Sequence, residues 1–217
     1  MKPYYSDDLV TIYNARCEDV LPSIDPASVD LLLTDPPYGI AVDTDQRKLS
    51  QQKGHTGHRT YAAVYGDDVP FDPAPLLAFG RVVLWGANHY ATKLPPGGQW
   101  LVWHKRDASP FHAAAELAWA NAGGRPVDLF DYTLKRTKTT DGPLHPTQKP
   151  VALMRWIVDR WTEPGDLVLD PYMGSGPVAQ ACHELGRRYI GIELVEDYCK
   201  VAASRLRQQA FDFGGAA

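Results

Sequence analysis

Two short strings, far apart in the chain, carry the side chains of this sequence that could do chemistry. The first, Thr34-Asp35-Pro36-Pro37-Tyr38-Gly39, follows the apolar run Leu31-Leu32-Leu33. The second, Asp170-Pro171-Tyr172-Met173-Gly174-Ser175-Gly176, follows Leu167-Val168-Leu169. Short apolar runs bounded by turn residues are typical of buried strands, so each string is expected in a loop at the end of a strand.

The first string suits the amino group of a nucleobase. Asp35 offers an acceptor, Pro36 and Pro37 fix their own φ angles and lack N–H groups, and Tyr38 adds a flat ring. Hydrogen bonds from an aromatic amine to Asp35 and to the Pro36 carbonyl would draw its nitrogen toward sp3 geometry and make it nucleophilic. A proline turn without a function would explain the prolines, but not the neighbouring Asp and Tyr.

The second string is a glycine loop that leads into a predicted helix starting near Pro177. Gly174 and Gly176 allow a bound group to approach the backbone, and the helix start offers free N–H donors. Glu193 follows at the end of the next predicted strand, where an acid can bind both hydroxyls of a ribose. A loop that only packs a helix on a strand, a dinucleotide site and an S-adenosylmethionine site all fit. A P-loop is excluded because no Lys-Ser/Thr follows the glycines.

Apolar runs and helical spacing alternate along the chain, which predicts the elements that position these loops. Helical spacing of apolar residues occurs over 154–161, 178–185 and 198–205. Strands are expected at 9–13, 29–34, 82–85, 100–103, 127–134, 167–169 and 189–192. This alternation predicts an α/β fold with a doubly wound, largely parallel sheet covered on both faces.

The length of 217 residues suits one α/β domain, or a domain with a small insertion, that spans residues 1–217, and 44% hydrophobic and 22% charged residues are typical of a globular protein. Apolar runs long enough for a membrane span or a secretory signal are missing from the sequence, so we expect no membrane contact. Cys17, Cys182 and Cys199 are an odd number without a C-x-x-C pair, so we expect a reducing cytoplasm and neither a disulfide framework nor a zinc ribbon. His55 and His58 lack further ligands, so no other metal site is expected. The net charge of −4 argues against a surface built wholly for nucleic acid.

With both loops considered, the sequence resembles the amino-group DNA methyltransferases, which methylate adenine N6 or cytosine N4 with S-adenosylmethionine. The resemblance rests on Asp35–Tyr38, on Asp170–Gly176 with Glu193, on residues 10–19, and on His145-Pro146-Thr147-Gln148-Lys149-Pro150. The catalytic loop precedes the cofactor loop, as in the permuted β class of this family. The resemblance implies a Rossmann-like methyltransferase sheet with circularly permuted motif order, and both loops at the carboxyl ends of adjacent central strands.

The resemblance also implies roles for individual residues. The catalytic set is Asp35, Pro36, Pro37 and Tyr38. The residues that bind S-adenosylmethionine are Asp19 at the adenine, Thr147, Gln148 and Lys149 near the methionine carboxylate, and Asp170, Tyr172, Gly174, Ser175, Gly176 and Glu193. The sequence departs from the family at Pro177, where Thr is frequent, and at His104, where an acidic residue is frequent.

Little of the chain is left to recognise a DNA sequence. The candidate segments are 40–65 and 105–146, so recognition is expected to be short, shared across a homodimer, or loose. A target base in double-stranded DNA must leave the stack to reach the pocket. The expected phosphate contacts, each of which could instead belong to a solvated charged face, are Arg47, Lys48, Lys53, Arg59, Lys105, Arg106, Lys135, Arg136 and Lys138.

The resemblance favours an enzyme that methylates adenine N6, because Asp is commoner in the catalytic motif of adenine enzymes and Ser in cytosine-N4 enzymes. Cytosine N4 is the near alternative. A nicotinamide-dependent oxidoreductase would explain the glycine loop but would leave Asp35–Tyr38 without a purpose. A DNA-binding protein without activity is disfavoured by the two intact motifs.

Overall fold

A computed structural model describes residues 1–40, 65–106, 113–133 and 148–214, without the side chains of 209–214. Within these residues, nine strands form one sheet in the order β1-β2-β9-β8-β3-β4-β6-β5-β7. The strands are β1 (Tyr5–Ser6), β2 (Val10–Asn14), β3 (Leu31–Thr34), β4 (Val82–Trp85), β5 (Gln99–His104), β6 (Ala115–Ala120), β7 (Val127–Asp131), β8 (Leu167–Asp170) and β9 (Arg188–Glu193).

The three helices that the apolar spacing predicts are present after β7, where they alternate with β8 and β9. The α-helices are α1 (Cys17–Val20), α3 (Val151–Trp161), α4 (Pro177–Leu185) and α5 (Glu196–Gly214). Short 3-10 helices are η1 (Leu21–Ser23), η2 (Pro26–Ser28), η3 (Ala87–His89) and η4 (Ala91–Lys93). Pro177 occupies the first turn of α4, and Gly186 ends that helix in the left-handed conformation, so both ends of α4 follow the sequence rules.

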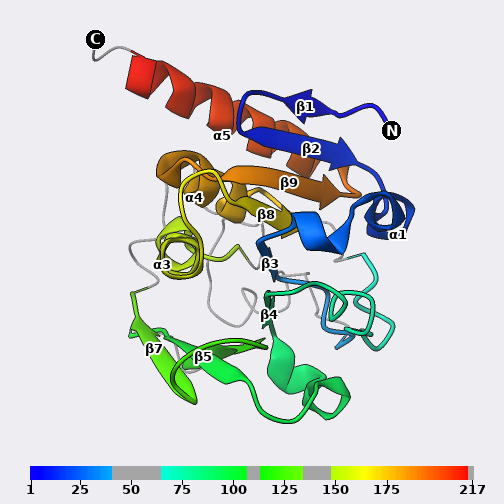
Figure 1. Ribbon diagram of the computed structural model, residues 1–217, viewed down its shortest axis with the longest axis vertical. Coiled ribbons are helices and arrows are strands. Elements are labelled where there is room, and N and C mark those ends of the chain that lie inside the picture. Colours follow the sequence, from blue (N-terminus) through cyan, green and yellow to red (C-terminus); the bar gives the residue numbers. More distant parts are fainter. Residues whose placement is uncertain (41–64, 107–112, 134–147, 215–217) are drawn as a thin grey trace, which may run out of the picture.

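Most strands of the sheet run parallel, as Figure 1 shows. β2, β9, β8, β3 and β4 pair in parallel. β6 pairs antiparallel with both β4 and β5, and β7 continues parallel to β5 at the edge. The short β1 is antiparallel to β2 at the other edge. The prediction of a largely parallel α/β sheet is therefore confirmed.

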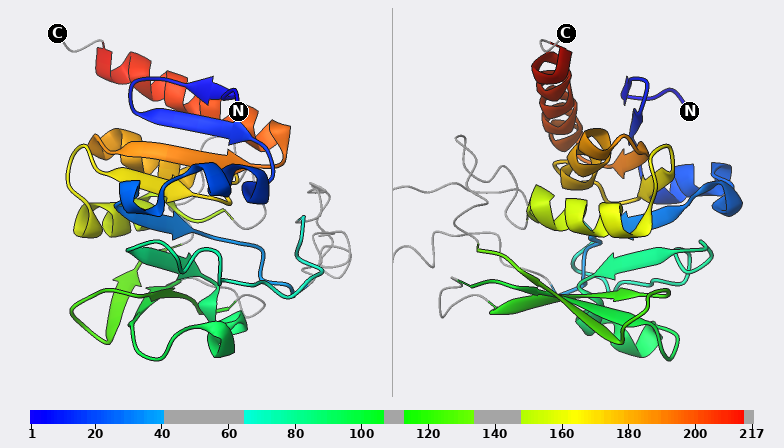
Figure 2. Two further views of the ribbon diagram at one scale, coloured as in Figure 1. Left: turned by 45° about the vertical axis from the view of Figure 1, so that its right-hand side comes forward. Right: turned by 60° about the vertical axis from the view of Figure 1, so that its left-hand side comes forward.

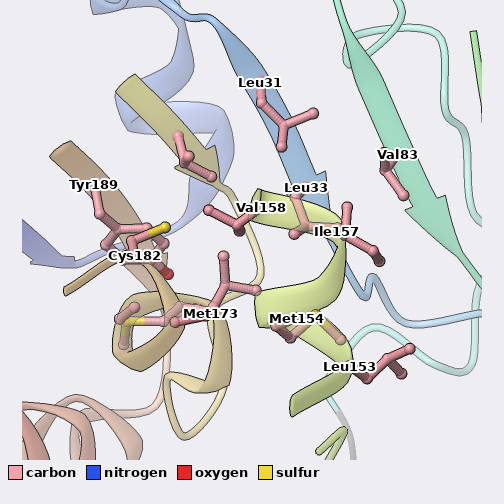
Figure 3. Packing of buried hydrophobic residues seen from close by; sticks show 14 of the residues in the cluster. Leu31, Leu33, Val83, Leu153, Met154, Ile157, Val158, Met173, Cys182 and Tyr189 are labelled. Carbon is pink, nitrogen blue, oxygen red and sulfur yellow. The ribbon is translucent and has the colours of Figure 1, made fainter. Parts of the chain in front are cut away.

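Both faces of the central strands are buried, which explains their continuous apolar runs. Leu31 and Leu33 of β3 pack in a core with α3, α4 and α5, whereas Leu32 joins a second core on the opposite face. Figure 2 shows the three long helices together on one face, and Figure 3 shows Ile157 and Val158 of α3 against β3. In the described residues, the second face is covered by α1, by 3-10 helices and by the turns around Phe71 and Phe79.

Three strands differ from the sequence predictions. The two-residue β1 was not expected. β6 was not expected, because Ala115-Glu116-Leu117-Ala118 is poor in β-branched residues and carries a charge. β7 was expected to be buried, but it is the edge strand, and its Val127 and Leu129 are 57% exposed. β6 and β7 lie within the candidate recognition segment 105–146, so part of that segment completes the sheet. Throughout the described residues, every helix is too short or too polar to cross a bilayer.

Candidate active site

The two loops singled out by the sequence meet at the carboxyl ends of adjacent strands. β3 and β8 pair in parallel with Leu32 opposite Leu169. Beyond this pair, the Thr34 hydroxyl donates a buried hydrogen bond of 2.6 Å to Asp170 Oδ1. The strand that leads to Asp35 is thus joined to the strand that leads to the glycine loop, as the permuted arrangement predicts.

Both carboxylate oxygens of Asp35 receive hydrogen bonds from side chains of the protein. The Tyr38 hydroxyl donates to Oδ1 at 2.5 Å, and the Lys149 ammonium donates to Oδ2 at 2.6 Å. Lys149 Nζ also lies 3.1 Å from the Tyr38 hydroxyl oxygen. The Asp35 side chain is 24% exposed, so it can still be reached from outside. Lys149, which the resemblance places near a methionine carboxylate, is hydrogen-bonded to Asp35, the expected catalytic acid.

Lys149 is buried, and a second carboxylate stabilises its charge. Its side chain is 3% exposed, and Nζ lies 2.9 Å from Oε2 of Glu116 on β6. The other oxygen of Glu116 is bound by Lys105. The two ammonium groups lower the pKa of Glu116 to about 2 despite its burial. Although burial opposes it, the charges of Asp35 and Glu116 hold the pKa of Lys149 well above its ordinary value.

The Asp-Pro-Pro-Tyr loop is held by contacts that the sequence did not reveal. The backbone N–H groups of Tyr38 and Gly39 each donate to Asp67 Oδ1 at 2.9 Å. The Tyr38 ring stacks on His89, with 5.0 Å between centroids and 13° between planes. The ring also packs against Gly86, where a Cβ would lie 1.9 Å from Tyr38 Cε1. Gly86 is therefore required for this position of the Tyr38 ring.

The glycine loop turns between β8 and α4 with both glycines at positive φ, +55° at Gly174 and +79° at Gly176. A Cβ on Gly176 would lie 2.8 Å from the Ala202 Cβ of α5, so this glycine is needed for packing. Within the described residues, a Cβ on Gly174 would meet nothing within 4 Å. Gly174 therefore borders open space, and Gly176 holds the loop against the helix behind it.

Glu193 binds the glycine loop directly. Its two carboxylate oxygens accept N–H bonds from Gly174 at 2.8 Å and Val195 at 2.7 Å. Burial raises the pKa of this carboxyl, although both N–H bonds oppose the rise. The sequence prediction that Glu193 ends the strand beside the glycine loop is confirmed by this geometry.

Tyr172, Ser175 and Gln148, three more of the expected cofactor residues, lie in the same loop or share a partner with it. Tyr172 is half-buried, and its hydroxyl interacts with the Cys17 thiol at the start of α1, the helix that carries the exposed Asp19. Arg205 of α5 donates to the Ser175 carbonyl at 3.0 Å and to Gln148 Oε1 at 3.4 Å. The Ser175 hydroxyl is buried without a hydrogen-bond partner in the described residues. An orphaned hydroxyl, open space beside Gly174 and a carboxylate that can accept from ribose hydroxyls are features that suit a nucleoside ligand.

Asp170 has a different environment from Asp35 and Glu116. It is fully buried, and its oxygens accept from Thr34, from the Tyr172 N–H at 3.2 Å and from the Tyr189 hydroxyl at 3.3 Å. These donors are neutral, so desolvation dominates and raises its pKa to about 7. Asp170 is therefore a buried, weakly acidic group that holds the start of the glycine loop against β3 and β9.

The structure describes two of the residues expected to contact DNA, Arg106 and Lys105. Arg106 is exposed and pairs with Asp131 at 2.6 Å. Lys105 is 9% exposed and pairs with Glu116, so the structure places its charge in the wall of the site. The others, together with Thr147 of the cofactor set, lie outside the described residues: Arg47, Lys48, Lys53, Arg59, Lys135, Arg136 and Lys138.

Three residues of the site were missed by sequence reasoning: Glu116, Asp67 and His89. Glu116 had one signal, since it is a lone acid in an otherwise apolar segment. Asp67 lies in a turn and His89 ends the short helix η3, and both contact Tyr38 from a distant part of the chain. Among the described residues, no three His, Cys, Asp or Glu side chains are arranged to hold a metal ion.

Comparisons with known proteins show which family the sequence resembles. A family model described as DNA methylase, of the N6/N4 type, matches residues 88–204, which include Glu116, Lys149, the glycine loop and Glu193. The chain is 25% identical to the type II methyltransferase M2.DpnII of Streptococcus pneumoniae, over 96% of this chain and 93% of the relative. The same figures hold for the type II methyltransferase M2.LlaDCHI of Lactococcus lactis subsp. cremoris.

Solved structures show the same fold. The complex of M1.HpyAVI with SAM matches with a TM-score of 0.61 and 24% identity, over 91% of this chain and 99% of that one. The PvuII DNA methyltransferase, described as cytosine-N4-specific, also matches with a TM-score of 0.61, at 18% identity over 95% of this chain and 88% of that one. At these identities the likeness concerns the fold.

Proposed function

This chain belongs to the N6/N4 family of DNA methylases, and we propose that it transfers a methyl group from S-adenosylmethionine to adenine N6 in a specific DNA sequence. One observation carries the proposal: Asp35 and Tyr38 lie beside the glycine loop, joined to it by the Thr34–Asp170 hydrogen bond. An acceptor for an amine and a site for a nucleoside therefore share one edge of the sheet. Membership of this family leaves the oxidoreductase alternative without support.

The residues around the glycine loop suit the proposed cofactor. Glu193 would accept from the ribose hydroxyls, and Asp19 and Tyr172 would border the adenine. The backbone of Gly174 and Ser175, with Gln148 and the neighbouring Thr147, would border the methionine part. When bound, S-adenosylmethionine supplies a methyl group made electrophilic by its sulfonium sulfur.

Asp35 would bind and orient the amino group of the target base. Its carboxylate and the Pro36 carbonyl accept the two N–H groups, which directs the nitrogen lone pair toward the methyl carbon. As the N–C bond forms and the C–S bond breaks, the nitrogen loses one proton, which Asp35 accepts or passes to water. Tyr38 would stack on the base and offset part of the cost of removing it from the duplex.

The choice of adenine rests on Asp35, the residue commoner in adenine enzymes, and cytosine N4 is the alternative outcome. Binding of duplex DNA would use the exposed Arg106 and the basic residues that the sequence carries within 40–65 and at 135–138. The segments 40–65 and 105–146 stay the proposed recognition segments of a single domain, and a homodimer could supply further contacts.

The test combines base identification with a variant of Asp35. The protein is incubated with methyl-labelled S-adenosylmethionine and duplex DNA, with RNA as a control, and the products are digested to nucleosides. We expect label in N6-methyldeoxyadenosine. Label in N4-methyldeoxycytidine would show that the target is cytosine N4. Label in RNA alone, or no label, would overturn the proposed function.

Asp35→Ala should abolish transfer while leaving the calorimetric dissociation constant of S-adenosylmethionine within about twofold, because Asp35 binds the amine and not the cofactor. Asp25→Ala is the control, since Asp25 caps the distant helix η2 through the Ala27 N–H. Loss of cofactor binding in Asp35→Ala would show that the role proposed for Asp35 is wrong.

A further inference from the structure

The Lys149 ammonium occupies the carboxylate oxygen of Asp35 that a target amine would need. Nζ lies 2.6 Å from Asp35 Oδ2, and it lies 5.8 Å and 5.7 Å from the ring centroids of Tyr38 and Trp85. A nitrogen with N–H donors, placed against this carboxylate and beside aromatic rings, has the same relation to Asp35 that we propose for the base amine. The protein thus fills this acceptor with its own lysine.

An incoming amine competes with the donors that Asp35 already binds. Oδ1 accepts the Tyr38 hydroxyl at 2.5 Å and Oδ2 accepts the Lys149 ammonium at 2.6 Å, and of these two donors only Lys149 is charged and can be held by a second carboxylate. Lys149 is 3% exposed, and a buried cation that loses its partner is strongly destabilised. Lys149 can therefore leave Asp35 only if another anion holds it.

Glu116 is that anion. Its Oε2 already lies 2.9 Å from Lys149 Nζ. Its other oxygen is held by Lys105, whose ammonium lies 4.9 Å from the ring centroid of Trp103. Glu116 faces Trp103 across the β5–β6 pair, so its position is set by the sheet rather than by a loop. The result is a row of alternating charges, Lys105, Glu116, Lys149 and Asp35.

We propose that Glu116 is a positioning residue for methyl transfer, which holds the Lys149 ammonium so that Asp35 can exchange the lysine for the amino group of the target base. This inference rests on the proposed function of Asp35. Glu116 itself touches neither substrate in this scheme and acts through Lys149. The strand β6, which the sequence did not predict, then contributes to the chemistry as well as to the sheet.

The first test is Glu116→Gln, which keeps the shape of the side chain and removes its charge. Without that charge, Lys149 pairs with Asp35 alone, and the amine displaces it less readily. On unmethylated DNA that contains the target site, we expect kcat/KM for DNA to fall by about tenfold or more, because a close charge pair is lost. The calorimetric dissociation constant of S-adenosylmethionine should stay within about twofold.

Glu184→Gln is the matched control, because it makes the same change in an ion pair with Arg155 between α3 and α4, outside the site. It should leave kcat/KM unchanged. Glu116→Asp should recover part of the lost activity, since it restores the charge at a shorter reach. A fold defect would instead lower the thermal melting temperature of Glu116→Gln and Glu116→Asp alike.

The decisive measurement is a double-mutant cycle with Lys149→Met, which removes the ammonium group from Asp35. If Glu116 acts through Lys149, then Glu116→Gln changes nothing further in the Lys149→Met background. The cycle is measured on kcat/KM and, without catalysis, on the anisotropy of a labelled target duplex. In this binding assay, Glu116→Gln alone should weaken target binding and leave binding of a duplex without the site unchanged.

An effect of Glu116→Gln that persists in the Lys149→Met background, or no effect in the wild-type background, would overturn the inference. The wild-type protein and Asp35→Ala separate this failure from failure of the proposed function. If the wild-type protein labels no base in DNA, the proposed function is wrong, and if Asp35→Ala transfers methyl groups at the wild-type rate, the role proposed for Asp35 is wrong. If the wild type is active and Asp35→Ala is inactive while Glu116→Gln equals the wild type, only the role of Glu116 is wrong.

Discussion

Three acidic side chains at this edge of the sheet show how local partners set the behaviour of one chemical group. Asp35 and Glu116 share the Lys149 ammonium, and the two lysines lower the pKa of Glu116 to about 2. Asp170 is bound by neutral donors, and burial raises its pKa to about 7. A carboxylate beside a buried cation stays charged, whereas one buried among hydroxyls tends to be protonated.

Gly174 allows a sharp test of the proposed cofactor site at the scale of one residue. Gly174→Ala places a Cβ at positive φ, at a cost of roughly 1 to 2 kcal/mol, and projects it into open space beside the loop. We expect affinity for S-adenosylmethionine to fall by about tenfold or more, because the backbone must approach the ligand closely. Isothermal titration calorimetry measures this change.

Gly186→Ala is the control for Gly174→Ala. Gly186 also has positive φ, +68°, and its Cβ would also meet nothing within 4 Å of the described residues, but it lies at the far end of α4. Both variants should lose similar stability in urea, and only Gly174→Ala should lose cofactor affinity. Equal affinities in the two variants would remove Gly174 from the proposed site.

At the scale of elements, the turn after β4 supports the catalytic loop after β3. Gly86 has a φ of +68°, and the Tyr38 ring lies against it and stacks on His89 of η3. The N–H groups of Tyr38 and Gly39 are bound by Asp67, which precedes β4 in the chain. The position of Tyr38 is therefore set by the segments around β4 as much as by the two prolines.

Gly86→Ala should displace Tyr38 and lower the rate of methyl transfer by about tenfold or more, since an added Cβ would overlap the ring. The matched variant is Gly97→Ala, where φ is +88° and a Cβ would meet nothing within 4 Å of the described residues. Single-turnover rates and urea unfolding compare the two. Gly97→Ala should lose some stability but keep its rate, and equal rates in both variants would contradict the requirement for an ordered Tyr38.

At the scale of the whole molecule, the sheet buries Asp170 at the end of β8, between Thr34 of β3 and Tyr189 of β9. Its folded pKa of about 7 lies above the ordinary value of 3.8, so folding favours the protonated form. The stabilisation is complete below pH 4 and is lost as the pH rises through about 7. The free energy of unfolding should fall by roughly 2 to 3 kcal/mol between pH 5 and pH 8 from this group alone.

Asp170→Asn should remove most of this decline, because the amide keeps an oxygen for Thr34 and Tyr172 and has no charge to desolvate. Urea unfolding of the wild type and the variant at pH 5 and pH 8 gives the comparison. Glu116 does not interfere, since its lowered pKa acts below about pH 4.5. An equal decline in both proteins would mean that Asp170 is ionised at little cost in the fold.

The sequence alone was enough to predict the central strands and the helices after Pro150, Pro177 and Glu193. These features depend on local patterns, such as the continuous apolar runs at Leu31–Leu33 and Leu167–Leu169 and the helical spacing after Pro177. Parallel strands place their carboxyl ends on one edge, so both loops are expected at that edge. The family resemblance added that the two strands are neighbours, and it added the proposed identity of substrate and cofactor.

Only the tertiary structure decided which charges meet. Lys149 precedes α3, Glu116 lies on β6 and Asp35 follows β3, so no spacing in the sequence relates them. β6 itself was hidden, because its Ala, Glu and Leu residues favour a helix and its antiparallel neighbours stabilise it as a strand. The pairs of Lys149 with Asp35 and Glu116 matter because a buried ammonium is strongly destabilised without a carboxylate partner, and the fold decides which carboxylates lie within reach.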